Sequence, residues 1–113
     1  MAQFKIGIMV DGFKAGLTAG IDKAAEAGAE GVQIFALSRE KPAGPVRDLD
    51  GELWGRRREI MRQLGDRGLV VSALCSEMGG FARQPALNPE KIEKTKRILE
   101  LAQEMGTRVV TAH

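Results

Sequence analysis

The chain has 113 residues, of which 43% are hydrophobic and 28% charged, a balance typical of one small globular domain and unlike that of a disordered tail. Its 17 Lys and Arg residues against 15 Asp and Glu give a net charge of only +2, and aromatic residues make up 4%. These values exclude a strongly phosphate-neutralising surface and a base-stacking nucleic-acid module. The single Cys indicates a reducing compartment, and the first apolar run, Ile6–Val10, is far too short to span a bilayer. We therefore expect a cytoplasmic chain that binds neither nucleic acid nor membrane.

Four short apolar runs alternate with longer helical patterns. The runs span residues 4–10, 31–36, 69–75 and 108–113. They are nearly continuous in apolar or small residues, as expected of strands that are covered on both faces. The first run is followed at once by Asp11-Gly12, which is a turn signal.

Three helices are expected between these runs, over residues 18–27, from about 52 to 64, and from Asn88 onward. The residues predicted to share the buried faces are Ile21, Ala24, Ala25 and Gly28 in the first helix, Leu53, Ile60, Met61 and Leu64 in the second, and Ile92, Ile98, Leu99, Ala102 and Met105 in the third. Asn88 is the predicted N-cap of the third helix.

The third helix also has two predicted pairs of opposite charge on its exposed side. Glu90 lies four residues before Lys94, and Glu93 lies four residues before Arg97. Such i,i+4 pairs support a helix.

Each helix ends in a glycine that leads within a few residues into the next strand. Gly28, Gly68 and Gly106 allow the left-handed backbone that stops a helix. The repeat of strand, helix and glycine turn predicts an α/β fold with a parallel sheet built by right-handed crossovers. At about 28 residues per unit, eight units need about 225 residues, which is the size of a (β/α)₈ barrel. We therefore expect residues 1–113 to be a single partial domain, an amino-terminal half-barrel.

Three segments carry a resemblance to a known family. They are Lys5–Asp11, Ala24–Ile34 and Met105–His113. Together they resemble the xylose isomerase-like TIM barrels, which include sugar isomerases, sugar-phosphate isomerase/epimerases and endonuclease relatives. The resemblance implies the first four strands and three helices of a (β/α)₈ TIM barrel.

The same resemblance implies a divalent-metal enzyme that moves a proton or hydride between adjacent carbons of a sugar or sugar phosphate. In the isomerase/epimerase branch the ligands of the metal (Mn, Mg, Co or Zn) come mostly from later strands. We therefore expect no metal site in this chain and no activity from it alone. In the endonuclease branch His residues end strands three and four, whereas here strand three ends in Cys75-Ser76-Glu77, without a His.

Residues at the carboxyl ends of barrel strands face the active site, and four positions qualify here, with Phe13 close to one of them, Asp11. Glu77 and His113 are the predicted catalytic residues, and Asp11, Phe13 and Cys75 are the predicted substrate-binding residues. Each of the four positions has a simpler interpretation beside the functional one. Glu77 is a solvated loop residue, His113 a disordered terminal residue, Asp11 a turn former and Cys75 a buried small hydrophobe.

Two functions from different classes remain open from the sequence. The first is the amino-terminal part of a sugar isomerase or epimerase, whose exposed strand edges predict a homo-oligomer or barrel closure with a second chain. The second is a stand-alone flavodoxin-like module that binds a ligand or partner without catalysis, at the point where its strand order reverses.

Overall fold

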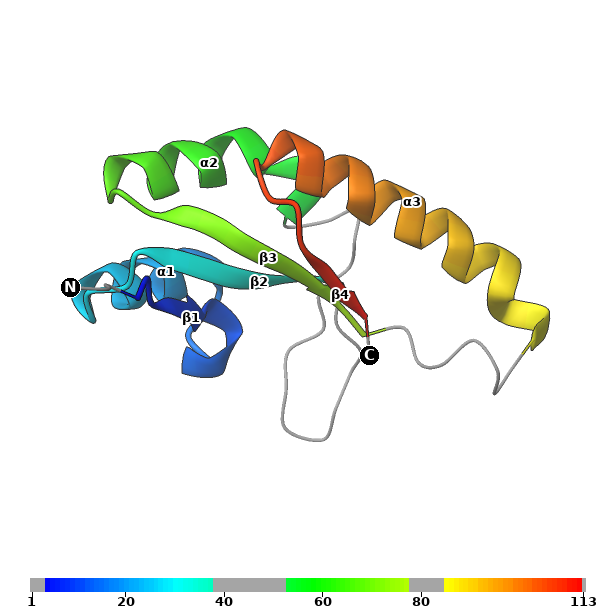
Figure 1. The fold of residues 1–113 in the computed structure, drawn as a ribbon, viewed down its shortest axis with the longest axis horizontal. Coiled ribbons are helices and arrows are strands. Elements are labelled where there is room, and N and C mark those ends of the chain that lie inside the picture. The colour runs from blue at the N-terminus through cyan, green and yellow to red at the C-terminus, as the bar shows by residue number, and fades with distance from the viewer. Residues whose placement is uncertain (1–3, 38–52, 78–84, 113) are drawn as a thin grey trace.

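The structure of the chain is a computed structural model that describes residues 4–37, 53–77 and 85–112. Parallel strands and α-helices alternate along the chain (Figure 1). The elements are β1 (Gly7–Met9), the 3₁₀ helix η1 (Val10–Phe13), α1 (Leu17–Glu26), β2 (Gly31–Leu37), α2 (Arg57–Asp66), β3 (Val70–Ser76), the 3₁₀ helix η3 (Pro85–Leu87), α3 (Asn88–Glu104) and β4 (Val110–Ala112). Among the described residues, no helix is both long and apolar enough to cross a membrane.

The four strands form one sheet in the order β1-β2-β3-β4, and every neighbouring pair is parallel. Gly7 pairs with Gly31, Gly31 with Val70, and Leu74 with Val110. The sheet therefore grows in one direction, as in the first part of a TIM barrel, and the predicted fold class is confirmed. A flavodoxin-like sheet reverses its strand order, so the described topology contradicts that alternative.

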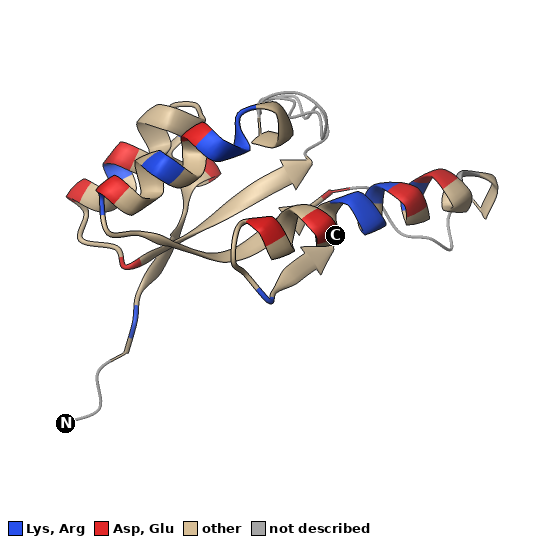
Figure 2. Ribbon diagram, turned by 90° about the horizontal axis from the view of Figure 1, so that it is seen from above, with Lys and Arg blue, Asp and Glu red and all other residues tan. Residues whose placement is uncertain are grey.

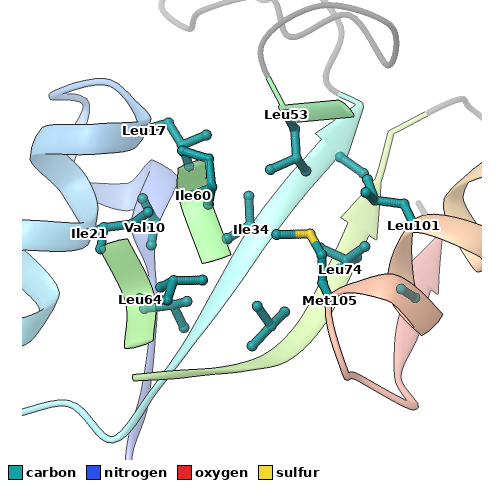
Figure 3. Packing of buried hydrophobic residues seen from close by; sticks show 14 of the residues in the cluster. Val10, Leu17, Ile21, Ile34, Leu53, Ile60, Leu64, Leu74, Leu101 and Met105 are labelled. Atoms are coloured by element: carbon teal, nitrogen blue, oxygen red, sulfur yellow. The ribbon is translucent and has the colours of Figure 1, made fainter. Parts of the chain in front are cut away.

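The hydrophobic core lies between the sheet and the three α-helices (Figure 3). Alternate residues of a strand point to opposite faces of the sheet. In β2, Val32 and Ile34 belong to the core, whereas Gln33 and Phe35 point to the other face and are only partly buried. The described helices therefore cover one face of the sheet, and the other, against which no described helix packs, is called the uncovered face.

Charged side chains lie on the helices and loops, and the four strands carry none (Figure 2).

An ion pair joins Arg57 Nε of α2 to Glu104 Oε2 of α3 at 2.6 Å. The Trp54 ring lies 5.0 Å from the guanidinium carbon of Arg57 and 5.3 Å from that of Arg97 on α3. The flank of α3 that carries Arg97 and Glu104 therefore faces α2 and Trp54. Each contact contributes only modest energy, because it lies at a partly exposed site.

The predicted glycine turns are confirmed. Gly28, Gly68 and Gly106 have φ angles of 85°, 67° and 78°, in the left-handed region that favours glycine. Each ends its helix and directs the chain into the next strand.

The predicted buried face of α3 is partly wrong. Ile98, Ala102 and Met105 are buried as expected, but Ile92 and Leu99 are 46% and 53% exposed. The structure buries Leu101 and Lys91 in their place, so the helix is rotated about its axis relative to the prediction. The long aliphatic stem of a Lys can cover apolar surface, which explains how a charged residue takes a core position.

In α1, Gly28 was predicted on the buried face, but it is exposed because the helix has already ended there. Ile21 and Ala24 are buried as predicted, and Leu17 and Gly20 complete that face.

Two polar predictions for α3 are also corrected. The Oδ1 atom of Asn88 is buried without a hydrogen-bond partner among the described residues, so it does not cap the helix. Glu93 pairs with Lys96 at 3.2 Å, while Arg97 stacks on Trp54.

The other predicted pair is confirmed, with Glu90 Oε1 lying 2.9 Å from Lys94 Nζ. The hydrogen bond and the charge of Lys94 lower the pKa of Glu90 below its ordinary value.

Several element boundaries differ from the prediction, three of them at identifiable residues. β1 ends at Met9, because the chain turns into η1 at Val10. β4 begins only at Val110. The backbone N–H of the residue before it, Val109, donates to the Thr107 hydroxyl at 3.2 Å. The regular part of α2 begins at Arg57, just after Gly55, a residue type that weakens a helix interior.

Two glycines within helices give a matched test of the packing of α1. Replacing Gly20 by Ala is expected to lower the free energy of unfolding by about 1–3 kcal/mol. The reason is that the added Cβ would lie 2.6 Å from Val10 Cγ1 and 2.9 Å from Val10 O. The Gly65→Ala control in α2, where nothing lies within 4 Å of the added atom, should raise it by about 0.5–1 kcal/mol. Urea unfolding followed by circular dichroism measures both free energies. An equal increase in the free energy of unfolding of the two variants would contradict this packing.

Candidate functional site

The candidate site lies at the carboxyl ends of the strands, which meet at one edge of the parallel sheet. In a TIM barrel this edge forms the active-site mouth. The backbone N–H of Glu77, directly after β3, donates to Leu37 O at the end of β2, over 3.0 Å. Glu77 is therefore held beside the end of the neighbouring strand, and its side chain is partly buried.

Asp11 is held at the same edge by a hydrogen bond to β2. Its Oδ2 atom accepts the Phe35 backbone N–H over 2.9 Å. Since β1 leaves the sheet after the pairing of Met9 with Gln33, the Phe35 amide lies beyond the last residue of β1. The carboxylate replaces the missing strand as acceptor, and the Asp11 carbonyl also accepts the Lys14 N–H in a turn over 3.2 Å. The structure thus assigns Asp11 a structural role, and its contact with substrate stays a prediction.

Phe13 and Cys75 take different places. Phe13 is partly buried and packs against the hydrophobic core. Cys75 is fully buried on the face opposite the helices, where its register partners are Phe35 and Thr111. This placement agrees with the interpretation of Cys75 as a buried small hydrophobe, and the substrate-binding roles of both residues stay predictions.

Two polar residues that the sequence analysis missed lie close to Cys75. The amide Nε2 of Gln33 donates to Cys75 Sγ, which holds the Gln33 side chain against the uncovered face of the sheet. Thr111, paired in register with Cys75, has a buried Oγ1 without a hydrogen-bond partner among the described residues. Each stands out in the sequence as a polar residue inside an otherwise apolar run, which is the signal that could have found them.

Of the predicted residues, the structure brings Asp11 and Glu77 to one edge of the sheet, without building a complete catalytic constellation. His113 lies outside the described residues. Within the described ranges, no three His, Cys, Asp or Glu side chains lie close enough together to hold a metal ion. The edge therefore offers carboxylates on two strand ends, those of Asp11 and Glu77, together with the Gln33 amide on the uncovered face.

The comparisons with known proteins agree with this geometry. The sequence model of the xylose isomerase-like TIM barrel family matches residues 21–113, and the chain belongs to this family. Among solved structures, the chain is similar to the crystal structure of the probable 3-DHS dehydratase AsbF, involved in the petrobactin synthesis, from Bacillus anthracis. The two chains are 17% identical with a TM-score of 0.67, over 96% of this chain and 38% of the AsbF chain. This likeness shows a shared fold, and this chain spans well under half of that protein. A search of curated proteins found no match.

Asp11 is expected to stabilise the fold as a hydrogen-bond acceptor for the Phe35 N–H, and not through its negative charge. Substitutions that remove the acceptor oxygen should therefore cost more stability than one that removes only the charge. Asp11→Ala removes the side-chain acceptor of the partly buried Phe35 N–H and should lower the free energy of unfolding by about 1–3 kcal/mol. Asp11→Asn keeps a carbonyl acceptor of the same size and should lose less than half as much. Urea unfolding curves of the two variants check this. Equal losses would mean that the negative charge, not the hydrogen bond, stabilises the edge.

Proposed function

We propose that this chain is part of a xylose isomerase-like TIM barrel enzyme that removes a proton from a carbon next to a carbonyl group. The substrate class is a sugar, a sugar phosphate or a related polyhydroxylated compound. The observation that carries the proposal is the position of Glu77 at the carboxyl end of a strand, in a sheet of this family's fold. Residues at this edge supply the chemistry in TIM barrel enzymes.

Glu77 is the proposed general base. Its carboxylate would accept the proton from carbon, and the electron pair of the broken C–H bond would move toward the neighbouring carbonyl oxygen. A positioned carboxylate of this kind contributes about 10²–10⁴-fold to a proton-transfer rate. His113, which lies outside the described residues, is the proposed second catalytic residue and would return the proton or bind a substrate hydroxyl.

Proton removal of this kind is common to isomerisation, epimerisation and dehydration. It is therefore compatible both with the isomerase or epimerase activity that the resemblance implies and with the probable dehydratase to which the fold is similar. We favour the isomerase or epimerase outcome, because the motifs at Lys5–Asp11, Ala24–Ile34 and Met105–His113 resemble the family that includes those enzymes.

A divalent metal is part of the family resemblance, but the described residues do not provide a set of ligands for one. Asp11 is already an acceptor for the backbone, and Cys75 is fully buried beside Gln33. We therefore propose that metal ligands come from residues other than those described, and we assign no step to the metal.

The first experiment is to read the open reading frame past the codon for His113. We expect an in-frame continuation with about four further strand–helix units that place Glu, Asp and His at strand ends, as an eight-unit barrel requires. A frame without such units, together with an inactive chain, would contradict the proposed enzyme.

The second experiment measures proton transfer in the complete protein. Incubated in D₂O with a panel of aldose, ketose and sugar-phosphate substrates, the enzyme should exchange the proton on the carbon next to the carbonyl, which ¹H NMR detects. Glu77→Gln should lower that exchange rate by about 10²–10⁴-fold.

The matched control is Glu26→Gln, an exposed carboxylate at the end of α1 and so at the opposite edge of the sheet, which should exchange at the wild-type rate. Equal rates in both variants would exclude Glu77 as the base. Binding of a sugar without any exchange would instead indicate a non-catalytic module.

A further inference from the structure

We propose that Gln33 is a substrate-binding residue, whose side-chain amide holds a hydroxyl group of a sugar while the carbon next to the carbonyl lies at Glu77. The assignment deepens the proposed function and rests on it, because it concerns the same mouth of the sheet. It narrows the substrate class to compounds that carry a hydroxyl group remote from the reacting carbon.

Gln33 is a polar residue in a position that a barrel normally fills with an apolar side chain. It points away from the helices, to the face that lines the interior of a TIM barrel, where bulky branched residues dominate. Its register partners are Met9 on β1 and Ala73 on β3. The small Ala73 side chain leaves room on that flank, so the longer Gln33 side chain can extend along the sheet.

The Gln33 side chain extends toward the carboxyl ends of the strands. Its Nε2 atom lies 2.6 Å from Cys75 Sγ, although Gln33 itself is level with Ala73, two residues earlier in β3. A thiol is a weak acceptor, so this bond orients the amide and uses only one of its two N–H groups. The second N–H and the carbonyl oxygen are suited to a hydroxyl group, which both accepts and donates a hydrogen bond.

Cys75 lies in a row on the uncovered face with its register partners Phe35 and Thr111. The Oγ1 atom of Thr111 is buried and has no hydrogen-bond partner among the described residues. Buried polar groups in native proteins are paired in the large majority of cases, so this row is expected to meet a further polar group. A substrate hydroxyl meets that requirement. A side chain from elsewhere in the protein is the alternative, which the experiments below distinguish.

The backbone between Cys75 and Glu77 sets a length scale for the substrate. The bond from the Glu77 N–H to Leu37 O continues the pairing of β3 with β2, so strand-like alternation places the side chains of Cys75 and Glu77 on the same face. Their Cα atoms are then about 7 Å apart along the strand. An open-chain pentose or hexose is long enough to place its reacting carbon at Glu77 and a remote hydroxyl at the Gln33 amide, whereas a triose is not.

The test combines a variant with deoxy sugars in the complete protein. The ketose with the fastest proton exchange in D₂O is compared with analogues that each lack one hydroxyl remote from the carbonyl. For wild type, one analogue should lower kcat/KM by about tenfold, the effect of one neutral hydrogen bond. Gln33→Met, which keeps the length of the side chain and removes the amide, should lower kcat/KM by about tenfold for the parent sugar and cause no further loss with that analogue.

Gln63→Met is the matched control. Gln63 lies on α2, and its Nε2 atom donates to Thr18 O and Asp22 Oδ1 of α1 over 2.9 and 3.0 Å, away from the mouth. This variant should keep the wild-type kcat/KM for every sugar. If the losses from Gln33→Met and from each missing hydroxyl multiply independently, Gln33 contacts no substrate hydroxyl and the proposal is wrong.

A binding measurement separates this proposal from the proposed reaction. Sorbitol has no carbonyl group and cannot undergo the proton removal, but it carries the hydroxyl groups that the Gln33 amide would bind. In ¹H–¹⁵N NMR spectra of the wild-type protein, saturable addition of sorbitol should shift the Gln33 side-chain amide signals, identified by their loss in Gln33→Met, and leave those of Gln63 in place.

The possible results are distinct. A shift at Gln33 without proton exchange from any sugar would contradict the proposed reaction and support the hydroxyl site. Proton exchange without a shift at Gln33 would support the reaction and overturn the hydroxyl site, leaving Gln33 with a partner inside the protein. Circular dichroism of Gln33→Met shows whether that variant folds, and the sorbitol titration of the wild-type protein decides the question even if it does not.

Discussion

A parallel sheet whose helices cover only one face determines much of the rest of this structure. Each glycine turn, such as that at Gly28, returns the chain to the amino end of the sheet, and each new strand is added on the same side of the last. The helices consequently gather on one face and build a core there. Strands of this kind are ordinarily covered on both faces, so the second face, with Gln33 and Phe35, calls for further structure to pack against it.

The parallel arrangement of the strands also determines where the candidate site lies. Because all strands are parallel, their carboxyl ends share one edge, and residues distant in sequence such as Asp11 and Glu77 reach it together. The early end of β1 has a local cost, since the Phe35 amide of β2 then lacks a strand beside it. The Asp11 carboxylate supplies the acceptor, so a residue that resembles a substrate ligand in the sequence first serves the architecture of the edge.

The sequence predicted the order and type of the elements because that information is local. Apolar runs, helical periodicity and glycine at helix ends are each read within a few residues. Predictions that required knowing what lies opposite a side chain were less successful. Ile92 and Leu99 look like core residues in a helical pattern, but the packing of Ile98, Leu101 and Ala102 in the core orients α3 so that they are exposed.

In the candidate site, too, local features could be predicted from the sequence and tertiary contacts could not. Glu77 could be found from the sequence because the end of an apolar run indicates the end of a strand. Gln33 was missed, since its importance depends on a contact with Cys75, which lies 42 positions away on the neighbouring strand β3. The cap predicted for Asn88 failed for a similar reason, because whether a side chain caps a helix depends on the local path of the chain and not on residue type alone.

By itself, the sequence determined the repeating strand–helix architecture, the glycine-ended helices and the likeness to xylose isomerase-like TIM barrels. These follow from backbone preferences and from the spacing of apolar residues. Only the tertiary structure decided that the strands follow one another without a reversal, which excludes the flavodoxin-like fold, and that the described helices all pack on one face of the sheet. Strand order and exposure depend on packing between segments far apart in the chain, and no local pattern of residues specifies that packing.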